Sequence, residues 1–359
     1  MFNYLLKKIY YSTLVIFGVL TIVFFLFNVL PGDPARMMLD KREDSKQLQV
    51  IKQKYGFDRP LLEQYILYLN DVLPISIHNM VNDQAFTFLN EKKYNFIKIF
   101  QIKERALVLK VPYLRTSFAK NGESVTKIIS TTFPNTFILA VSSILFALIF
   151  GLFFGVISSL NKNSIFDKVI LYFSVMGMAL PSFFSSIIVA WVFGYLLQNY
   201  TGLNMYGSLF EIDDYGISYS LALKNLILPA FTLGIRPLAV IIQLSRNSLL
   251  DVLSMDYIRT AHAKGLSKYL VIFKHALRNS LNPVITAVSG WFASLLAGAV
   301  FVEYIFAWNG LGKEIVDALN NMDLPVVMGS VLFISLIFVV INILVDLIYV
   351  MVDPRTKIE

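Results

Sequence analysis

Seven basic side chains lie close together in one polar stretch, residues 251–286, between two long apolar segments. Their chemistry is binding rather than bond breaking, since side chains of this kind hold acidic groups of another molecule. A basic element of this size between membrane spans is typical of a docking element for a cytoplasmic partner. The simpler interpretation, a positive inner loop that only fixes orientation, stays open. The seven are Arg259, His262, Lys264, Lys268, Lys274, His275 and Arg278.

Two helices joined at Gly265 are predicted to position these side chains. Gly265 follows Lys264, where a left-handed residue would end the first helix. Ser267 can cap the second helix, and Pro283 either ends the unit or begins the next span. The predicted apolar stripes repeat every three or four residues. They are Leu250, Leu253, Tyr257 and Ala261 in the first helix, and Leu266, Leu270, Phe273, Leu277 and Leu281 in the second.

The composition indicates a membrane protein with several spans. Hydrophobic residues make up 56% of it and charged residues 15%, which is too apolar for an ordinary soluble domain. Six apolar runs reach the ~20 residues that cross a bilayer. The chain has no cysteine and no glycine-rich phosphate loop, so thiol chemistry and ATP binding by the usual cradle are excluded. The runs are 9–30, 133–160, 169–197, 221–244, 284–302 and 326–350.

The distribution of basic residues predicts the orientation. With the amino terminus inside, the inner segments carry twelve Lys and Arg residues, against Lys224 and Lys313 in the two short outer loops. The positive-inside rule then predicts a multi-pass protein with both termini on the cytoplasmic side of the membrane. The first run, after Lys7 and Lys8, is read as an uncleaved span because no small-x-small cleavage site follows it.

A polar segment separates the first two spans and cannot lie in hydrocarbon. Within it, residues 74–111 are predicted to form an extracytoplasmic insert. The alternation of Ile97, Ile99 and Ile102 in residues 96–111 indicates short strands, and so a small αβ subdomain. Contact with a partner protein and a passive elaboration both remain open for this insert.

The sequence motifs of the basic stretch resemble those of a known protein family. Residues 257–266 read YIRTAHAKGL, with HALRN at 275–279 and Pro283 beyond. They resemble the EAA loop of binding-protein-dependent ABC importer permeases, in the peptide-importing branch where Arg-Thr-Ala replaces Glu-Ala-Ala. His262 departs from the Arg or Lys usual there. The resemblance implies that the ATPase contact is made by Tyr257, Arg259, Thr260, Ala261, Lys264 and Gly265.

Other motifs of the same family follow in the same order: PGDP at 31–34, the Glu-x-x-Phe and Gly-Leu-Gly elements within 303–312, Asp-x-Pro at 323–325, and the run from Asn342 to Arg355. Asn309 replaces the proline usual before the first glycine. In relatives the outer loop is re-entrant and faces the binding protein and the substrate route. The resemblance assigns that role to Glu303, Phe306, Gly310, Gly312 and Asp323.

The fold implied is an all-α polytopic membrane protein: six transmembrane helices of the type I ABC importer permease, with an extracytoplasmic insert between helices 1 and 2. The expected segments are a first transmembrane helix (1–30), an extracytoplasmic segment (31–122), a transmembrane core (123–352) with its coupling loop (251–282), and a cytoplasmic tail (353–359).

The function implied is half of the translocation pathway of an ATP-driven peptide importer. The expected partners are a homologous second permease, two cytoplasmic ATPase subunits, an extracytoplasmic peptide-binding protein and the lipid bilayer, with no nucleic acid. This chain is expected to bind no cofactor or metal and to catalyse nothing, since ATP and Mg belong to the ATPase.

Alternatives remain for the ligand and for one charged residue. Relatives with these motifs also import nickel and other small ligands. An ion-coupled secondary transporter would place acids near the midplane, whereas here they lie at span ends. An intramembrane enzyme would need paired carboxylates or His-Glu metal spacing, which the spans lack. Arg236, inside the fourth span, either lines the pore or is capped at a turn broken by proline.

Overall fold

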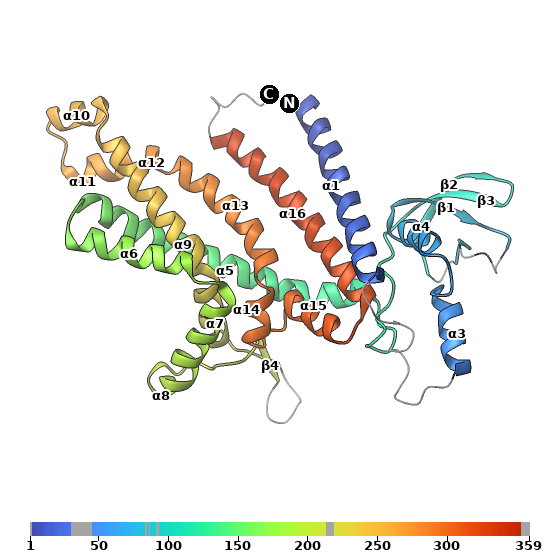
Figure 1. Ribbon diagram of the computed structural model, residues 1–359. Helices are drawn as coiled ribbons and strands as arrows, with labels where there is room; N and C mark the ends of the chain where they lie inside the picture. The colour runs from blue at the N-terminus through green and yellow to red at the C-terminus, as the bar shows by residue number, and fades with distance from the viewer. Residues whose placement is uncertain are drawn as a thin grey trace. The chain divides into compact units, whose positions relative to one another are not determined.

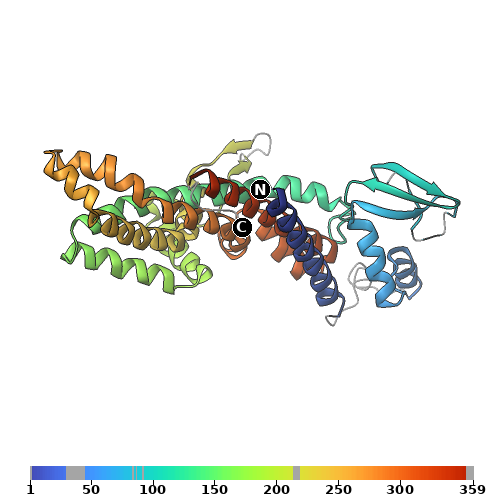
Figure 2. The same ribbon diagram turned by 90° about the horizontal axis from the view of Figure 1, so that it is seen from above.

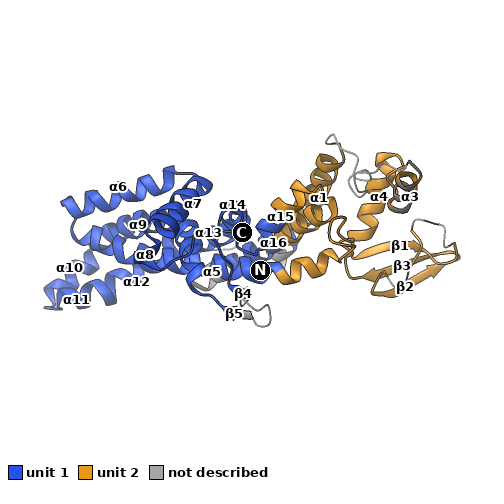
Figure 3. Cartoon of the chain, turned by 90° about the horizontal axis from the view of Figure 1, so that it is seen from below, with its two compact units in different colours: residues 1–8, 132–314, 337–359 blue, residues 9–131, 315–336 orange. Residues whose placement is uncertain are grey.

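The structure, a computed structural model (Figure 1), describes residues 2–29, 45–82, 85, 87–90, 93–212 and 219–352. The PGDP motif at 31–34 and the tail at 353–359 lie outside the described residues. Two compact units are present (Figure 3). Unit 1 comprises Met1–Lys8, Thr132–Glu314 and Ile337–Glu359, and unit 2 comprises Ile9–Thr131 and Ile315–Leu336.

The long helices agree with six predicted spans. Among the described residues, four are long and apolar enough to cross a bilayer: α1 (Phe2–Val29), α5 (Val125–Leu160), α9 (Lys224–Leu253) and α16 (Leu324–Val352). Two bent pairs raise the count to six if each pair is one span. One is α6 (Ile165–Ala179) with α7 (Ser182–Trp191) and the π-turn η1 (Val192–Leu196); the other is α11 (Lys268–Leu270), the π-turn η2 (Val271–Ala276) and α12 (Leu277–Ser280) with α13 (Asn282–Gly298).

The third span is broken rather than kinked. The sequence predicts a kink at Pro181, but α6 and α7 meet at an angle of 110°. Leu180, just before the proline, is extended, with φ −81° and ψ 131°. The proline ring disfavours a helical conformation for the preceding residue, so the chain turns sharply there.

Unit 1 is held together by small residues between α5 and α9. A Cβ atom added to Gly151 would lie 2.6 Å from Cγ2 of Ile241, and one added to Gly155 would overlap the side chain of Ser245. The Gly-x-x-x-Gly spacing in the second span therefore serves close packing within this chain. Figure 2 shows α9 running between α5 and α6 and towards α10.

Short elements connect the helices of unit 1 on the side away from α10. A two-stranded antiparallel sheet pairs β4 (Phe210–Ile212) with β5 (Tyr219–Leu221), after the single turn α8 (Gln198–Thr201). Beyond α13 come α14 (Val300–Ile305) and α15 (Leu311–Asn320). These segments carry the outer-loop motif.

Unit 2 contains a small αβ subdomain in which the predicted strands lie within residues 74–111, whereas its helices precede that insert. Two helices, α3 (Ser45–Tyr55) and α4 (Leu61–Val72), precede an antiparallel sheet of order β1-β3-β2. The strands are β1 (Ile75–Asn79), β2 (Phe96–Ile102) and β3 (Arg105–Lys110), so the strand prediction for 96–111 is confirmed. Helix α4 packs on α1, where the rings of Phe24 and Tyr68 stack with centroids 5.5 Å apart.

A neutral histidine is built into this subdomain. The His78 side chain is fully buried; its Nε2 lies 3.0 Å from the Ser76 hydroxyl and its Nδ1 3.1 Å from the carbonyl of Thr87. The carbonyl can only accept, so Nδ1 carries the proton and Nε2 accepts from Ser76. Burial, aided by the charge of Lys110, lowers the pKa of His78 to about 4.

The subdomain is therefore expected to lose stability as the pH falls from about 6.5 towards 4. In the unfolded chain His78 takes up a proton near pH 6.5, whereas in the folded protein it does so only near pH 4. Between these values the unfolded state binds more protons, so a falling pH favours unfolding. Thermal denaturation between pH 4 and 8 measures this loss. His78→Gln should flatten the curve across that window, and an equally steep curve in that variant would contradict the assignment.

Candidate functional site: the docking helix and the outer loop

The basic stretch contains a short helix anchored by two inward-facing residues. Helix α10 (Asp256–Ala263) follows a break at Ser254 and Met255 that ends α9. Ile258 and Ala261 are only 2% and 7% exposed, and they pack in one cluster with buried apolar residues of α9 and η2. The helix is thus bound firmly to the span that precedes it.

The opposite face of α10 is open. The Arg259 side chain is 77% exposed and pairs at 3.3 Å with Asp256, itself 94% exposed. Thr260 and Lys264 are also exposed. The structure therefore brings these predicted docking residues to one surface. Ala261 lies on the inner face instead, so it supports the helix from below.

Tyr257 braces the docking element. Its ring is 38% exposed, and its hydroxyl accepts a hydrogen bond of 2.9 Å from Nδ2 of Asn279 on α12. Gly265 has φ +75°, which confirms the predicted left-handed end of the helix. Ser267 accepts from the backbone N–H of Leu270, which confirms the predicted cap. Pro283 lies in the first turn of α13, so it begins the next span.

The predicted apolar stripes are right only in part: Leu253, Ala261 and Leu266 pack in the cluster that anchors α10. In the first stripe Tyr257 is exposed and Ile258 is buried instead, because the break after α9 resets the helical phase. In the second, Leu270 and Phe273 are exposed. The buried positions are instead Val271, Ile272, Ala276 and Ser280. The π-turn η2 inserts a residue into the turn and rotates every later side chain.

A buried ion pair lies at the same end of the helices as α10, where α5 turns into α6 (Figures 1 and 2). The Arg246 guanidinium on α9 donates from Nε and Nη2, each at 2.7 Å, to the two oxygens of Asp167 on α6. Asp167 also accepts from Ser158 Oγ and, at 2.9 Å, from the backbone N–H of Asn163. This fork ties the span that carries α10 to the α5–α6 turn. No local signal in the sequence marks Asp167 as the partner of Arg246.

Asp167→Asn is expected to lower uptake by about tenfold or more, because it leaves the Arg246 charge buried without its partner, at a cost of roughly 3–5 kcal/mol. Uptake into vesicles and the thermal midpoint of the purified chain measure the effect. Arg246→Lys keeps the charge but loses the two parallel hydrogen bonds, so its uptake and thermal midpoint should fall between those of the wild type and Asp167→Asn. Normal uptake and an unchanged midpoint for Asp167→Asn would show that the pair is dispensable.

The outer loop is organised by the carboxylate of Glu303. Its side chain is fully buried, and Oε2 accepts hydrogen bonds from the backbone N–H groups of Gly312 at 2.7 Å and Lys313 at 3.1 Å. These groups begin α15, so the carboxylate caps that helix. Burial raises the pKa of Glu303 to about 7. Oε1 meets no hydrogen-bond partner within the described part of the chain.

The two glycines of the motif make room for this carboxylate. A Cβ atom on Gly312 would lie 2.5 Å from Cα of Val300 and 2.9 Å from Oε2 of Glu303. One on Gly310 would overlap the Glu303 carboxylate itself. Phe306 is 1% exposed beside the fully buried Trp308. The predicted loop residues Glu303, Phe306, Gly310 and Gly312 therefore lie together in one closely packed turn. Asn309 lies in the same turn, where Ala307 has φ +53°.

Asp323 belongs to unit 2 and takes no part in the hydrogen bonds described around Glu303; it binds the turn before α5 instead. Its buried carboxylate accepts from the Ser117 hydroxyl and from the backbone N–H groups of Phe118 at 3.0 Å and Ala119 at 3.2 Å. It fastens the turn before α5 to the start of α16.

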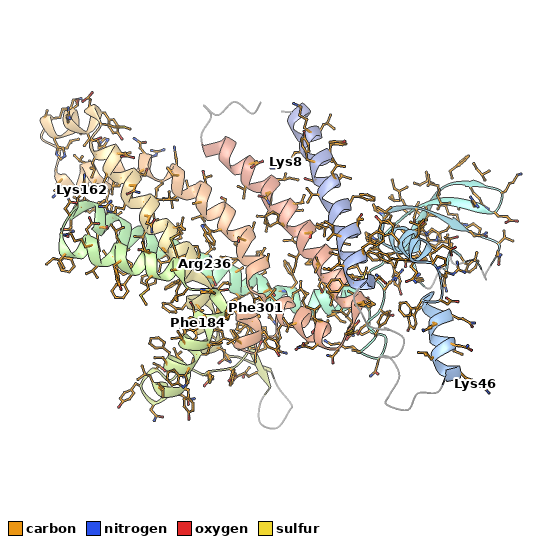
Figure 4. All side chains as sticks on the ribbon, viewed as in Figure 1. Lys8, Lys46, Lys162, Phe184, Arg236 and Phe301 are labelled. Atoms are coloured by element: carbon orange, nitrogen blue, oxygen red, sulfur yellow. The ribbon has the colours of Figure 1, made fainter. Side chains whose placement is uncertain are left out.

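Two charged residues lie within the spans. Arg236, singled out from the sequence, is exposed on α9 (Figure 4) and lies next to Pro237 inside the helix. Its role in lining the pore stays a prediction. Asp346 of α16 pairs with Lys8 of α1, whose Nζ also donates to the carbonyl of Asn342 at 3.0 Å.

Comparison with known proteins finds two matching families. The family described as "Binding-protein-dependent transport system inner membrane component" matches residues 147–358. A second family, described as "Binding-prot-dependent transport system membrane comp, N-term", matches residues 1–85. The first match covers the helices from α5 onward, including α10 and the outer loop.

Similar proteins extend along the whole chain. A di/tripeptide transport system permease of Pseudomonas aeruginosa is 32% identical over 357 residues, 95% of this chain and 94% of that protein. A dipeptide transport system permease of Bacillus subtilis is 32% identical over 360 residues, 100% of this chain and 99% of that protein. Among solved structures, an inward-facing methionine ABC transporter has a TM-score of 0.50 at 17% identity, covering 64% of this chain and 97% of that one. That likeness concerns the fold alone.

Proposed function

This chain belongs to the family of binding-protein-dependent transport system inner membrane components, and from that premise we propose that it forms half of the translocation pathway of an ATP-driven importer of short peptides. It is an integral membrane protein with the fold of a type I ABC importer permease. Full-length relatives named as dipeptide and di/tripeptide permeases support the peptide ligand. The observation that carries the proposal is the anchored helix α10 with its exposed polar face.

The chain acts without covalent chemistry of its own. ATP and Mg bind to two cytoplasmic ATPase subunits. A homologous second permease completes the pathway, and an extracytoplasmic binding protein delivers the peptide. The polar face of α10, with Arg259 and Thr260 exposed and no phosphate-binding loop in the chain, is suited to receive force from such a partner.

The geometry explains how force would reach the pathway. Ile258 and Ala261 bury α10 against α9 and η2, so displacement of α10 moves α9 and the α12–α13 segment with it. The fork between Arg246 and Asp167 carries the same displacement to α6. Packed helices move as rigid bodies between discrete arrangements, which provides alternating access.

The orientation follows from charge. The segments assigned to the inner side are rich in Lys and Arg, and the α10 loop is the richest of them. Both termini and α10 are therefore proposed to lie on the cytoplasmic side of a bacterial-type cytoplasmic membrane.

Uptake of a radiolabelled dipeptide by proteoliposomes that contain the whole complex tests the proposal. ATP inside the lumen that faces α10 should drive accumulation, and the chain should co-purify with its ATPase. Accumulation of nickel but not dipeptide would favour the small-ligand alternative. Ion-driven uptake by this chain alone would refute the importer reading.

A further inference from the structure

A second polar centre lies in unit 2, and the function proposed above uses none of it. It surrounds the carboxylate of Asp71, which is 6% exposed. Oδ1 accepts from Lys93 Nζ at 2.9 Å and from the Tyr94 hydroxyl at 2.6 Å, and Oδ2 accepts from Arg115 Nε at 3.0 Å. The Asp71 carbonyl accepts from Lys110 Nζ at 2.7 Å. Two cations thus bind the Asp71 carboxylate, and a third binds the backbone carbonyl of the same residue.

The positive charge of this centre is not balanced. Lys93, Lys110 and Arg115 carry three positive charges around the single negative charge of Asp71. Burial lowers the pKa of Lys110 to about 8, although the Asp71 carboxylate acts in the opposite direction. An additional anion would therefore be favourable here.

Arg115 has hydrogen-bonding capacity to spare. Its Nε is bound to Asp71, but its two terminal nitrogens donate to no residue in the described part of the chain. Its backbone has φ +67°, an uncommon conformation for a residue with a side chain. Such conformations persist where the surroundings fix them, and they cluster at binding sites.

Two of these cations, Lys93 and Arg115, line a cavity of about 630 Å³, within the range of small-ligand sites. Its polar wall includes Lys93, Arg115 and Asn90, and its apolar wall includes Phe57, Tyr113 and Phe118. A guanidinium fork matches a carboxylate with two parallel hydrogen bonds. The aromatic wall suits an apolar side chain next to that carboxylate. A bare inorganic anion has no such side chain, so the cavity fits a peptide better.

We propose that this cavity is a carboxylate-binding site for a peptide segment, with Arg115 and Lys93 holding the carboxylate and Phe57, Tyr113 and Phe118 contacting a neighbouring apolar side chain. In naming a peptide as the carrier, the inference rests on the proposed function. The carboxylate comes either from the C-terminus of a free short peptide or from an acidic side chain on the surface of the extracytoplasmic binding protein.

The test measures binding without transport, so that its failure is separate from a failure of the importer proposal. The full chain in lipid nanodiscs is equilibrated with radiolabelled Ala-Phe and with its C-terminal amide, which differ only in the carboxylate. The wild type should bind the free acid about tenfold more tightly or better, and Arg115→Gln should remove that preference. Lys98→Gln, an exposed cation of β2 outside the cavity, is the matched control and should keep it.

A second variant guards against misfolding. Lys93→Gln leaves Asp71 bound to Arg115 and Tyr94, so its thermal midpoint should stay near that of the wild type while its preference for the free acid falls. In a second arm, the purified binding protein replaces the dipeptide. Weaker complex formation in both variants, without dipeptide binding, assigns the site to an acidic side chain of that protein. Equal binding of acid and amide together with unchanged complex formation would overturn the proposal.

Discussion

Arg259→Glu is expected to reduce ATP-driven uptake at least a hundredfold while the chain still inserts and folds. Among the described residues, Arg259 makes only an exposed ion pair with Asp256 at 3.3 Å, and such pairs contribute about 0–1 kcal/mol. Its loss therefore costs little stability. Reversing its charge at a docked surface places like charges together, which costs several kcal/mol of association free energy. Uptake and ATPase co-purification are measured in parallel.

A matched control separates docking from charge as such. Lys268→Glu changes an exposed cation of α11, in the same loop but outside α10, and should keep most of the uptake. Gly265→Pro should behave like Arg259→Glu, because proline cannot adopt the φ of +75° found there. If Arg259→Glu and Gly265→Pro both import normally, α10 is not the docking element.

Gly310→Ala and Gly312→Ala are each expected to abolish uptake, since both place a Cβ atom inside the closed contact around Glu303. Overpacking of a tight contact costs about 1–3 kcal/mol and forces the surrounding backbone to move. Here it would displace the start of α15, whose first N–H groups are bound to the Glu303 carboxylate. Uptake by the complex and the thermal midpoint of each variant measure the effect.

The two glycines should differ when Glu303 is also changed. The three atoms nearest to the Cβ of Gly310→Ala all belong to the Glu303 side chain, so Gly310→Ala added to Glu303→Ala should cost little more. The Cβ of Gly312→Ala also meets the backbone of Val300 at 2.5 Å, so that addition should remain destabilising. Equal behaviour of the two double variants would contradict the contact described for this loop.

Local signals made the docking helix predictable. Gly265 after Lys264 and a serine two residues later mark a helix end and a helix start, and the structure confirms both. The phase of the apolar stripes was not predictable, because a break of two residues and one π-turn each shift the phase without a clear mark in the sequence. Periodicity assumes an uninterrupted helix.

Contacts between residues far apart in the chain could not be predicted from the sequence. Resemblance gave Glu303 and the two glycines as separate motif positions, but not that the glycines exist to admit the carboxylate. The partner of Arg246, Asp167, lies 79 positions away in the chain and carries no local signal. The strands of the insert were predicted from alternation, whereas the cations gathered on Asp71 come from three separate segments.

Site-specific cross-linking of α10 tests the central claim most directly. The chain has no cysteine, so Thr260→Cys introduces a single thiol on the exposed face of α10. In the assembled complex, a bifunctional thiol reagent should join it to the ATPase subunit, with a yield that changes when ATP is added. Labelling of that thiol only from the extracellular side of intact cells, with no ATPase adduct, would contradict the account.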